Sequence, residues 1–298
     1  MVAVWAMGMR GGQLPVQDCV RVWQALVRPV LEYGTVVWGD VEWPEAEQVQ
    51  REMGKMILRC SSKMSNEVVL GELGWWTLKG RRDFLRLTYW GKIVGGQVSP
   101  NRLLYHVYQV SRCRYNYTQH NRNYTQHNRK TNQEDHQHNQ HEHKEENKEN
   151  KENKHDDDEE EEDNTHNTHT RREDNNNRWC KHTHMIFKSI GMEQTWLNNT
   201  LTEEEEASFR VTVRDRITAR EEAQWLARMQ NKPKLRTYRR LKTKLCFQHN
   251  YLTRQDREAR EVMTRLRGGT NELRIETGRY AITNRERRLD ESERRCLI

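Results

Sequence analysis

Apolar residues recur at helical spacing through most of the first 110 residues. Spacings of three and four residues place such side chains on one side of a helix. They predict helices over 16–37, 45–60, 65–73, 77–94 and 101–110. Asp18 is a candidate cap for the first helix, and Pro29 predicts a kink or break inside it. Ser65 and Gly74 are suited to begin and end the third. With six tryptophans before residue 77, the pattern predicts a small, aromatic-rich helical core.

Helical periodicity returns near Trp179 and continues to about residue 267. A short helix is expected around 185–192. Thr202, followed by four glutamates, forms a capping-box pattern that begins a longer helix extending past Met229. Thr253 opens a further helix with Asp256 at its third position, and Gly268 and Gly269 end it. A short strand is expected near Leu273.

The residues between these two regions carry no such pattern. Residues 114–177 hold a tandem YTQHNRN/YTQHNRK repeat, KENKENKEN and DDDEEEED, and only three tyrosines could contribute to a core. Such a composition cannot bury enough apolar surface to offset the entropy of ordering the chain. The expected fold class is therefore mainly α. It comprises a helical domain over 1–113, a disordered low-complexity spacer over 114–177 and a basic helical domain over 178–298.

Charge is divided unevenly among the three parts. Their formal net charges are +4, −7 and +10, which together give the +7 of the whole chain. The basic excess favours a polyanionic partner, RNA or DNA before a membrane. It is concentrated in residues 228–244, here called the basic stretch, which holds eight cations and no acid: Arg228, Lys232, Lys234, Arg236, Arg239, Arg240, Lys242 and Lys244.

The basic stretch is the candidate nucleic-acid site. Helical spacing predicts that Arg236, Arg239, Arg240 and Lys244 lie near one another, an arrangement suited to phosphates rather than base edges. Tyr238 and Tyr251 are candidate stacking residues for bases. The alternative is that the stretch is only a solvated helix face.

Other chemistry finds little support in the sequence. Cys180, His182 and His184 could contribute to a metal site, but they lie at the edge of the spacer, and zinc prefers four ligands on an ordered scaffold. No phosphate-binding loop or serine nucleophile motif is present. No cofactor, catalytic residue or membrane span is expected. The scattered cysteines favour a reducing compartment, so an intracellular location, nuclear or cytoplasmic, is expected.

Several long phrases of the sequence resemble one family. These are LVRPVLEYGTVVWGD (26–40), the run from VQREMGKMILRC to YWGKIVGG (49–96), WCKHTHMIFKSIGMEQTW (179–196) and the run from YRRLKTKLCFQHNYLTRQDREA to IETGRY (238–280). They are similar to the region after the polymerase palm in LINE-type, non-LTR retrotransposon reverse transcriptases.

The resemblance implies a thumb-like helical domain and a basic connector that hold a primer–template or the element's RNA through phosphates. The family's polymerase activity depends on paired metal-binding aspartates, and no Tyr-x-Asp-Asp motif occurs here. Relatives continue into a zinc knuckle, which is expected to be cut off near Cys296. We therefore expect a non-catalytic fragment that binds RNA or DNA without sequence preference. The alternative is a decayed or inactive reading frame that acts at most as a helical protein–protein interaction module.

Overall fold

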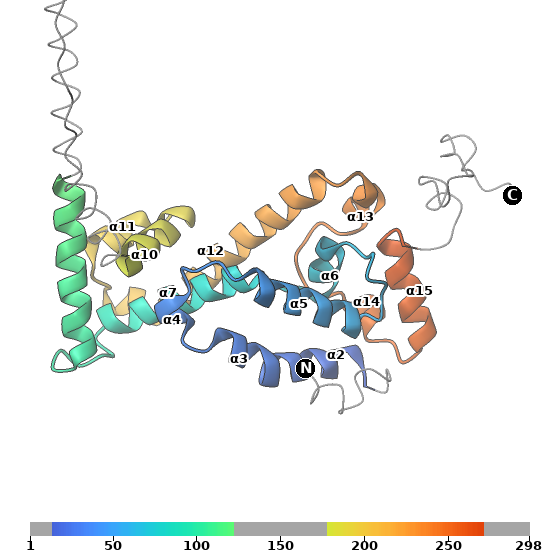
Figure 1. Ribbon diagram of the computed structural model, residues 1–298, viewed down its shortest axis with the longest axis horizontal. Coiled ribbons are helices and arrows are strands. Elements are labelled where there is room, and N and C mark those ends of the chain that lie inside the picture. The colour runs from blue at the N-terminus through green and yellow to red at the C-terminus, as the bar shows by residue number, and fades with distance from the viewer. Residues whose placement is uncertain (1–13, 122–177, 271–298) are drawn as a thin grey trace, which may run out of the picture. The chain divides into compact units, whose positions relative to one another are not determined.

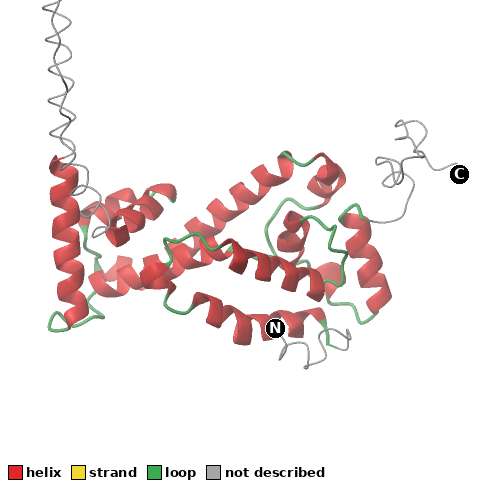
Figure 2. Ribbon diagram, viewed as in Figure 1, coloured by secondary structure: helices red, strands yellow, loops and turns green. Residues whose placement is uncertain are grey.

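The computed structural model describes residues 14–121 and 178–270. Within these ranges the chain is mainly helical and contains no strand beyond an isolated bridge between Leu73 and Phe247 (Figure 2). The expected mainly α class, with helical regions on both sides of residues 122–177, is confirmed. The strand expected near Leu273 and most of the expected spacer lie outside the described residues.

The helical regions are divided into two compact units, here called unit 1 and unit 2. Unit 1 combines Met1–Gly91 with Ile186–Ile298, and unit 2 is Lys92–Met185. These limits differ from the boundaries at 113 and 178 expected from the sequence. The reason is a shared core, because Trp225, Met229 and Leu235 belong to the same buried cluster as Met53 and Val68.

The first helical stretch of unit 1 is broken more often than expected. It consists of α2 (Val16–Val22), the π-helical turn η2 (Trp23–Val27), α3 (Arg28–Glu32) and α4 (Thr35–Trp38). Pro29 has no N–H to continue the ladder, which agrees with the change of helix type just before it. The candidate cap Asp18 is wrong, since Pro15 precedes the first turn and Asp18 instead accepts a hydrogen bond from Arg21.

Three further helices follow: α5 (Pro44–Ile57), α6 (Asn66–Leu73) and α7 (Leu78–Val94). Helix α6 is the centre of unit 1, because nearly all its residues are buried and both α5 and α12 pack on it. Figure 1 shows α6 beside α5. The predicted ends of α6 are confirmed. Ser65 occupies the cap position, although its hydroxyl donates to Glu67, and Gly74 ends the helix at φ 65°.

The second region comprises α10 (Arg178–Ser189), α11 (Glu193–Asn198), α12 (Glu203–Gln230), the 3₁₀ turn η3 (Pro233–Leu235), α13 (Arg236–Leu241), α14 (His249–Leu252) and α15 (Arg257–Arg267). The capping box of Thr202 is confirmed, with Glu205 as its partner. Asp256 caps α15 by accepting from the Ala259 N–H at 3.0 Å.

Aromatic side chains fill a second part of unit 1. Trp90 lies against Phe187, Trp196 and Phe209, with ring centroids 4.7–6.0 Å apart. All four are buried. Such rings contribute both buried area and edge or offset contacts, so residues on either side of 122–177 stabilise the same unit.

Unit 2 corrects the expected start of the spacer. A helix covers residues 103–121 and therefore extends past residue 113. Tyr115 is buried, and its hydroxyl lies 2.6 Å from Nδ1 of His184. The first residues assigned to the spacer are thus part of a packed helix. In the described part of the chain, no helix is both long and apolar enough to cross a bilayer.

Candidate nucleic-acid interface

The basic stretch does not form one continuous helix. Arg228 lies near the end of α12, Lys234 in η3, and Arg236, Arg239 and Arg240 in α13. Pro233 begins the 3₁₀ turn, since its ring is tolerated only at the start of a helix. Lys244 lies beyond Leu241, where α13 ends. The predicted helical register between Arg240 and Lys244 is therefore wrong.

The first part of the stretch is bound to a buried carboxylate. Lys232 donates to Glu67 Oε2 at 2.5 Å, and Arg228 Nε lies 3.9 Å from Oε1. The Glu67 side chain is 7% exposed and also accepts from the Ser65 hydroxyl. Burial acts to raise the pKa of Glu67, but the hydrogen bonds from Lys232 and Ser65 outweigh it and the pKa is lowered. These two cations thus hold α12 and its following turn to α6.

Lys242 is also engaged in the fold. The residue is 4% exposed, and its ammonium group donates to the Cys246 carbonyl at 2.6 Å and to Gln248 Oε1 at 2.9 Å. It closes the loop between α13 and α14. Its predicted role as a phosphate contact is wrong, because the side chain has no surface to offer.

The two tyrosines predicted to stack on bases are part of the core. Tyr238 and Tyr251 are 1% and 5% exposed. The Tyr251 hydroxyl donates to Glu72 Oε2 at 2.8 Å, and burial raises the pKa of both tyrosines. Arg267 completes the arrangement with two hydrogen bonds to Glu72 Oε1, at 3.1 and 3.0 Å. Base stacking on these rings is therefore excluded in this fold.

Three cations of the stretch remain exposed: Arg236, Arg240 and Lys244. Within residues 14–121 and 178–270, none of them forms an ion pair. Arg239 and Lys234 are half-buried and donate to the backbone carbonyls of Gln230 and Lys63. The exposed cations of the stretch are thus concentrated in and just after α13.

Two arginines that sequence reasoning missed add to this region. Helix α13 packs against α15, and Arg254 and Arg265, just before and within α15, are exposed. Neither has a carboxylate partner among the described residues. The other arginines of α15 are engaged: Arg257 by Glu261, Arg267 by Glu72, and Arg260 by the backbone carbonyls of Arg254 and Gln255.

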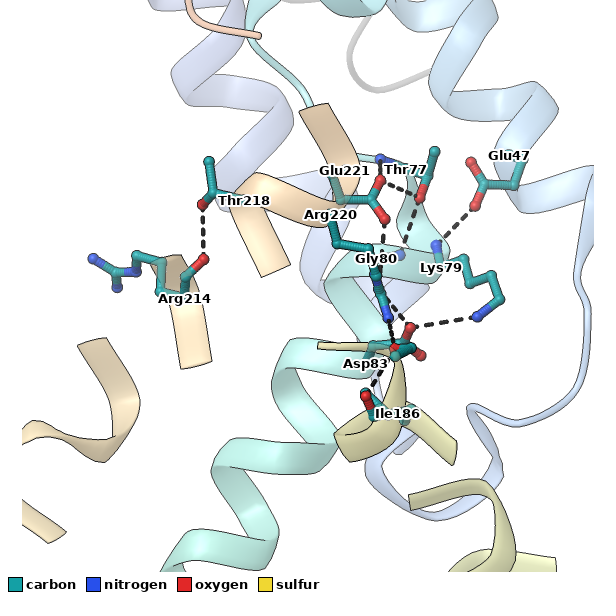
Figure 3. A network of polar contacts seen from close by, with 11 residues as sticks. Glu47, Thr77, Lys79, Gly80, Asp83, Ile186, Arg214, Thr218, Arg220 and Glu221 are labelled. Carbon is teal, nitrogen blue, oxygen red and sulfur yellow. Dashed lines mark hydrogen bonds and ion pairs between the residues drawn. The ribbon is translucent and has the colours of Figure 1, made fainter. Parts of the chain in front are cut away.

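The buried carboxylates of unit 1 are structural. Glu221 accepts from the Thr77 N–H and hydroxyl, at 3.1 and 2.8 Å, and so ties α12 to the start of α7 (Figure 3). Asp83 accepts from Arg220 at 2.7 Å and from Lys79 at 3.3 Å. Each of these carboxylates is therefore bound by donors from the fold.

The candidate metal residues are not brought together as a site. Cys180, His182 and His184 all lie on α10, where Cys180 is buried and His184 contacts Tyr115. Across the described ranges, no group of three metal-ligating side chains is assembled. Residues two apart on a helix do not face each other. His182 therefore points away from Cys180 and His184 and cannot share a metal ion with them.

Comparisons with known proteins add no identity. No protein-family model matches the chain, and no curated protein or solved structure matches it.

Proposed function

We propose that unit 1 is a non-catalytic nucleic-acid-binding module that holds RNA or DNA through phosphates without sequence preference. The observation that carries the proposal is the set of exposed cations at α13, Arg236, Arg240 and Lys244, without carboxylate partners in the described structure. Arginine forks and lysine point charges are the usual protein partners of phosphate. Arg254 and Arg265 extend the same basic character to the neighbouring helix.

The proposal includes an origin. The sequence phrases quoted above favour a fragment derived from a LINE-type reverse transcriptase, comprising its thumb-like region and connector. In that view the helical scaffold serves to present cations, and the family's polymerase chemistry belongs to its palm, whose paired-aspartate motif does not occur in these 298 residues. The interior use of the carboxylates Asp83, Glu72 and Glu221 agrees with a role in binding rather than catalysis.

The test is the salt dependence of RNA binding. Neutralising phosphates releases counterions, so the logarithm of the binding constant falls linearly with the logarithm of salt concentration, by about 0.7 per contact for a single strand. We expect the triple variant Arg236→Ala, Arg240→Ala and Lys244→Ala to weaken binding to a labelled single-stranded RNA and to reduce the slope by about 2.

A matched triple variant controls for net charge. Arg21, Lys188 and Arg257 are exposed cations of unit 1, each paired with a carboxylate. Replacing these three by alanine removes the same formal charge and should leave the slope unchanged. Equal slopes for the two triple variants would reduce the α13 cations to a solvated helix face and remove the support for the proposal.

A protein-interaction role is the second candidate, and one observation favours it. Leu26, Val30, Tyr33 and Val37 are between 49% and 84% exposed and follow one another at intervals of three and four residues. Exposed large apolar side chains gathered in one segment are typical of protein contacts. A concentration-dependent mass in sedimentation, abolished by Val30→Asp and Tyr33→Asp, would support this role.

A further inference from the structure

A pocket of about 230 Å³ opens on unit 1, and no residue of the basic stretch lines it. Its walls combine three tryptophans with three arginines: Trp23, Trp75, Trp76, Arg28, Arg81 and Arg214. They come from η2, α3, the turn after α6, α7 and the middle of α12. Residues on both sides of 122–177 therefore line the pocket, and no sequence motif predicts it.

The pocket contains buried polar atoms that the fold does not satisfy. Gln50 is 2% exposed and donates from Nε2 to the Trp76 carbonyl at 3.0 Å, while its Oε1 has no hydrogen-bond partner. Because a carbonyl only accepts, this contact fixes which end of the amide is the oxygen. Trp75 Nε1 is likewise buried without an acceptor. Buried polar groups are nearly always hydrogen-bonded, so an unpaired acceptor and an unpaired donor on two residues that line the same pocket indicate a ligand with both functions.

The arginines give the pocket a positive excess. Arg81 binds Glu32 with hydrogen bonds of 2.8 and 3.1 Å, and Arg28 lies 3.6 Å from the same carboxylate. One carboxylate thus serves two guanidinium groups. Burial, followed by the charge of Arg81, lowers the pKa of Arg28. Arg214 is exposed and has no carboxylate partner in the described structure, and its guanidinium lies 5.8 Å from the centre of the Phe84 ring. An anionic group bound in the pocket is stabilised by the positive charge of all three arginines.

The tryptophans supply an apolar wall. Trp23 and Trp75 stack at 5.3 Å and are almost fully buried, whereas Trp76 is half-buried and lines the pocket. Aromatic side chains are the usual stacking partners of unpaired bases. Drug-sized ligands occupy roughly 300–1,000 Å³, so the smaller volume here suits a single planar ring system with its charged group.

We propose that this pocket binds one unpaired nucleotide of a single-stranded nucleic acid, with its base against Trp76 and its phosphate toward Arg28 and Arg214. Gln50 Oε1 accepts from a base N–H and Trp75 Nε1 donates to a base acceptor. This inference deepens the proposed function, on which it rests, by adding a base-binding site to the phosphate contacts at α13.

The probe is tryptophan fluorescence of the full chain titrated with AMP and UMP, compared with ribose 5-phosphate and inorganic phosphate. We expect the nucleotides to quench the fluorescence and the base-free phosphates to bind at least roughly tenfold more weakly, as loss of base stacking implies. A short single-stranded RNA should displace the nucleotide. Equal affinity for inorganic phosphate, or no response to any nucleotide, would overturn the proposal. Binding of AMP that RNA does not compete with would overturn the assignment to a strand.

Two arginines provide a matched pair of variants. Arg214 and Arg210 are one turn apart on α12 and lie 5.8 and 6.0 Å from the same Phe84 ring, but only Arg214 lines the pocket. Arg214→Ala should weaken AMP binding roughly tenfold through the lost charged hydrogen bond, and Arg210→Ala should leave it unchanged. Equal effects would overturn the site.

The proposed pocket and the proposed phosphate contacts at α13 can be contradicted independently of each other. If the α13 triple variant weakens RNA binding while AMP does not bind and Arg214→Ala has no effect, the pocket is wrong and the proposed function stands. If AMP binds through Arg214 while the α13 triple variant binds RNA with an unchanged salt slope, the phosphate surface is wrong and the pocket stands.

Discussion

The two halves of the basic stretch carry similar residues but are used differently. Arg228 and Lys232 lie at a largely buried carboxylate, Glu67, and connect α12 to α6. Arg236 and Arg240 are exposed on α13 without carboxylate partners in the described structure. A count of charges along the sequence treats these halves alike. The difference shows that a cation is available to a binding partner only where no carboxylate of the fold already pairs with it.

The largest expected effect is on the interior side of this comparison. Glu72 is fully buried and holds Arg267 and Tyr251. Glu72→Ala should lower the free energy of unfolding by about 3–5 kcal/mol, because it leaves the Arg267 charge buried and unpaired. Urea denaturation measures this as a lower midpoint at unchanged slope.

An exposed acid provides the control for that variant. Asp215 lies on the surface of α12 and forms no ion pair among the described residues. Asp215→Ala should change the stability by no more than about 0.5 kcal/mol. Similar losses for the two variants would show that Glu72 contributes no more than a surface acid.

A pH dependence separates the paired half from the exposed half. The pKa of Glu67 is lowered from its ordinary value of 4.5. A carboxyl whose pKa is depressed in the folded state stabilises the fold above its unfolded value, and this contribution is lost as the pH falls through the folded pKa. The stability gap between wild type and Glu67→Gln should therefore be full above about pH 4.5 and shrink below it.

Urea midpoints measured from neutral pH into this acid range check the prediction. Asp215→Asn serves as the comparison, since its carboxylate contacts no cation in the described structure. If the difference in stability between wild type and Glu67→Gln stays constant through the acid range, the contacts with Lys232 and Ser65 do not stabilise ionised Glu67.

Local signals in the sequence predicted much of the fold. Thr202 begins α12 and Gly74 ends α6 as expected, because caps and positive φ depend on neighbouring residues alone. The expected helix start at Thr253 is wrong, because Thr253 follows the last turn of α14 and α15 begins after its cap, Asp256. The family resemblance and the absence of catalysis stay predictions, since no comparison bears on them.

Long-range packing accounts for what the sequence could not predict. Tyr238 and Tyr251 sit among cations in the sequence, but they contact Val68 and Glu72, some 170 residues earlier. The pocket between Gln50, Trp76 and Arg214 also depends on such packing. Periodicity shows which face of a helix is apolar, but not which distant helix covers it.

The most direct test compares two double variants that each remove two positive charges from the same stretch. Arg236→Ala with Arg240→Ala should reduce the salt slope of single-stranded RNA binding by about 1.4 and leave the urea midpoint near that of wild type. Arg228→Ala with Lys232→Ala should do the reverse, keeping the slope and lowering the midpoint, because Glu67 loses its cations. If both double variants change the slope equally, the fold does not divide the stretch, and the central claim is contradicted.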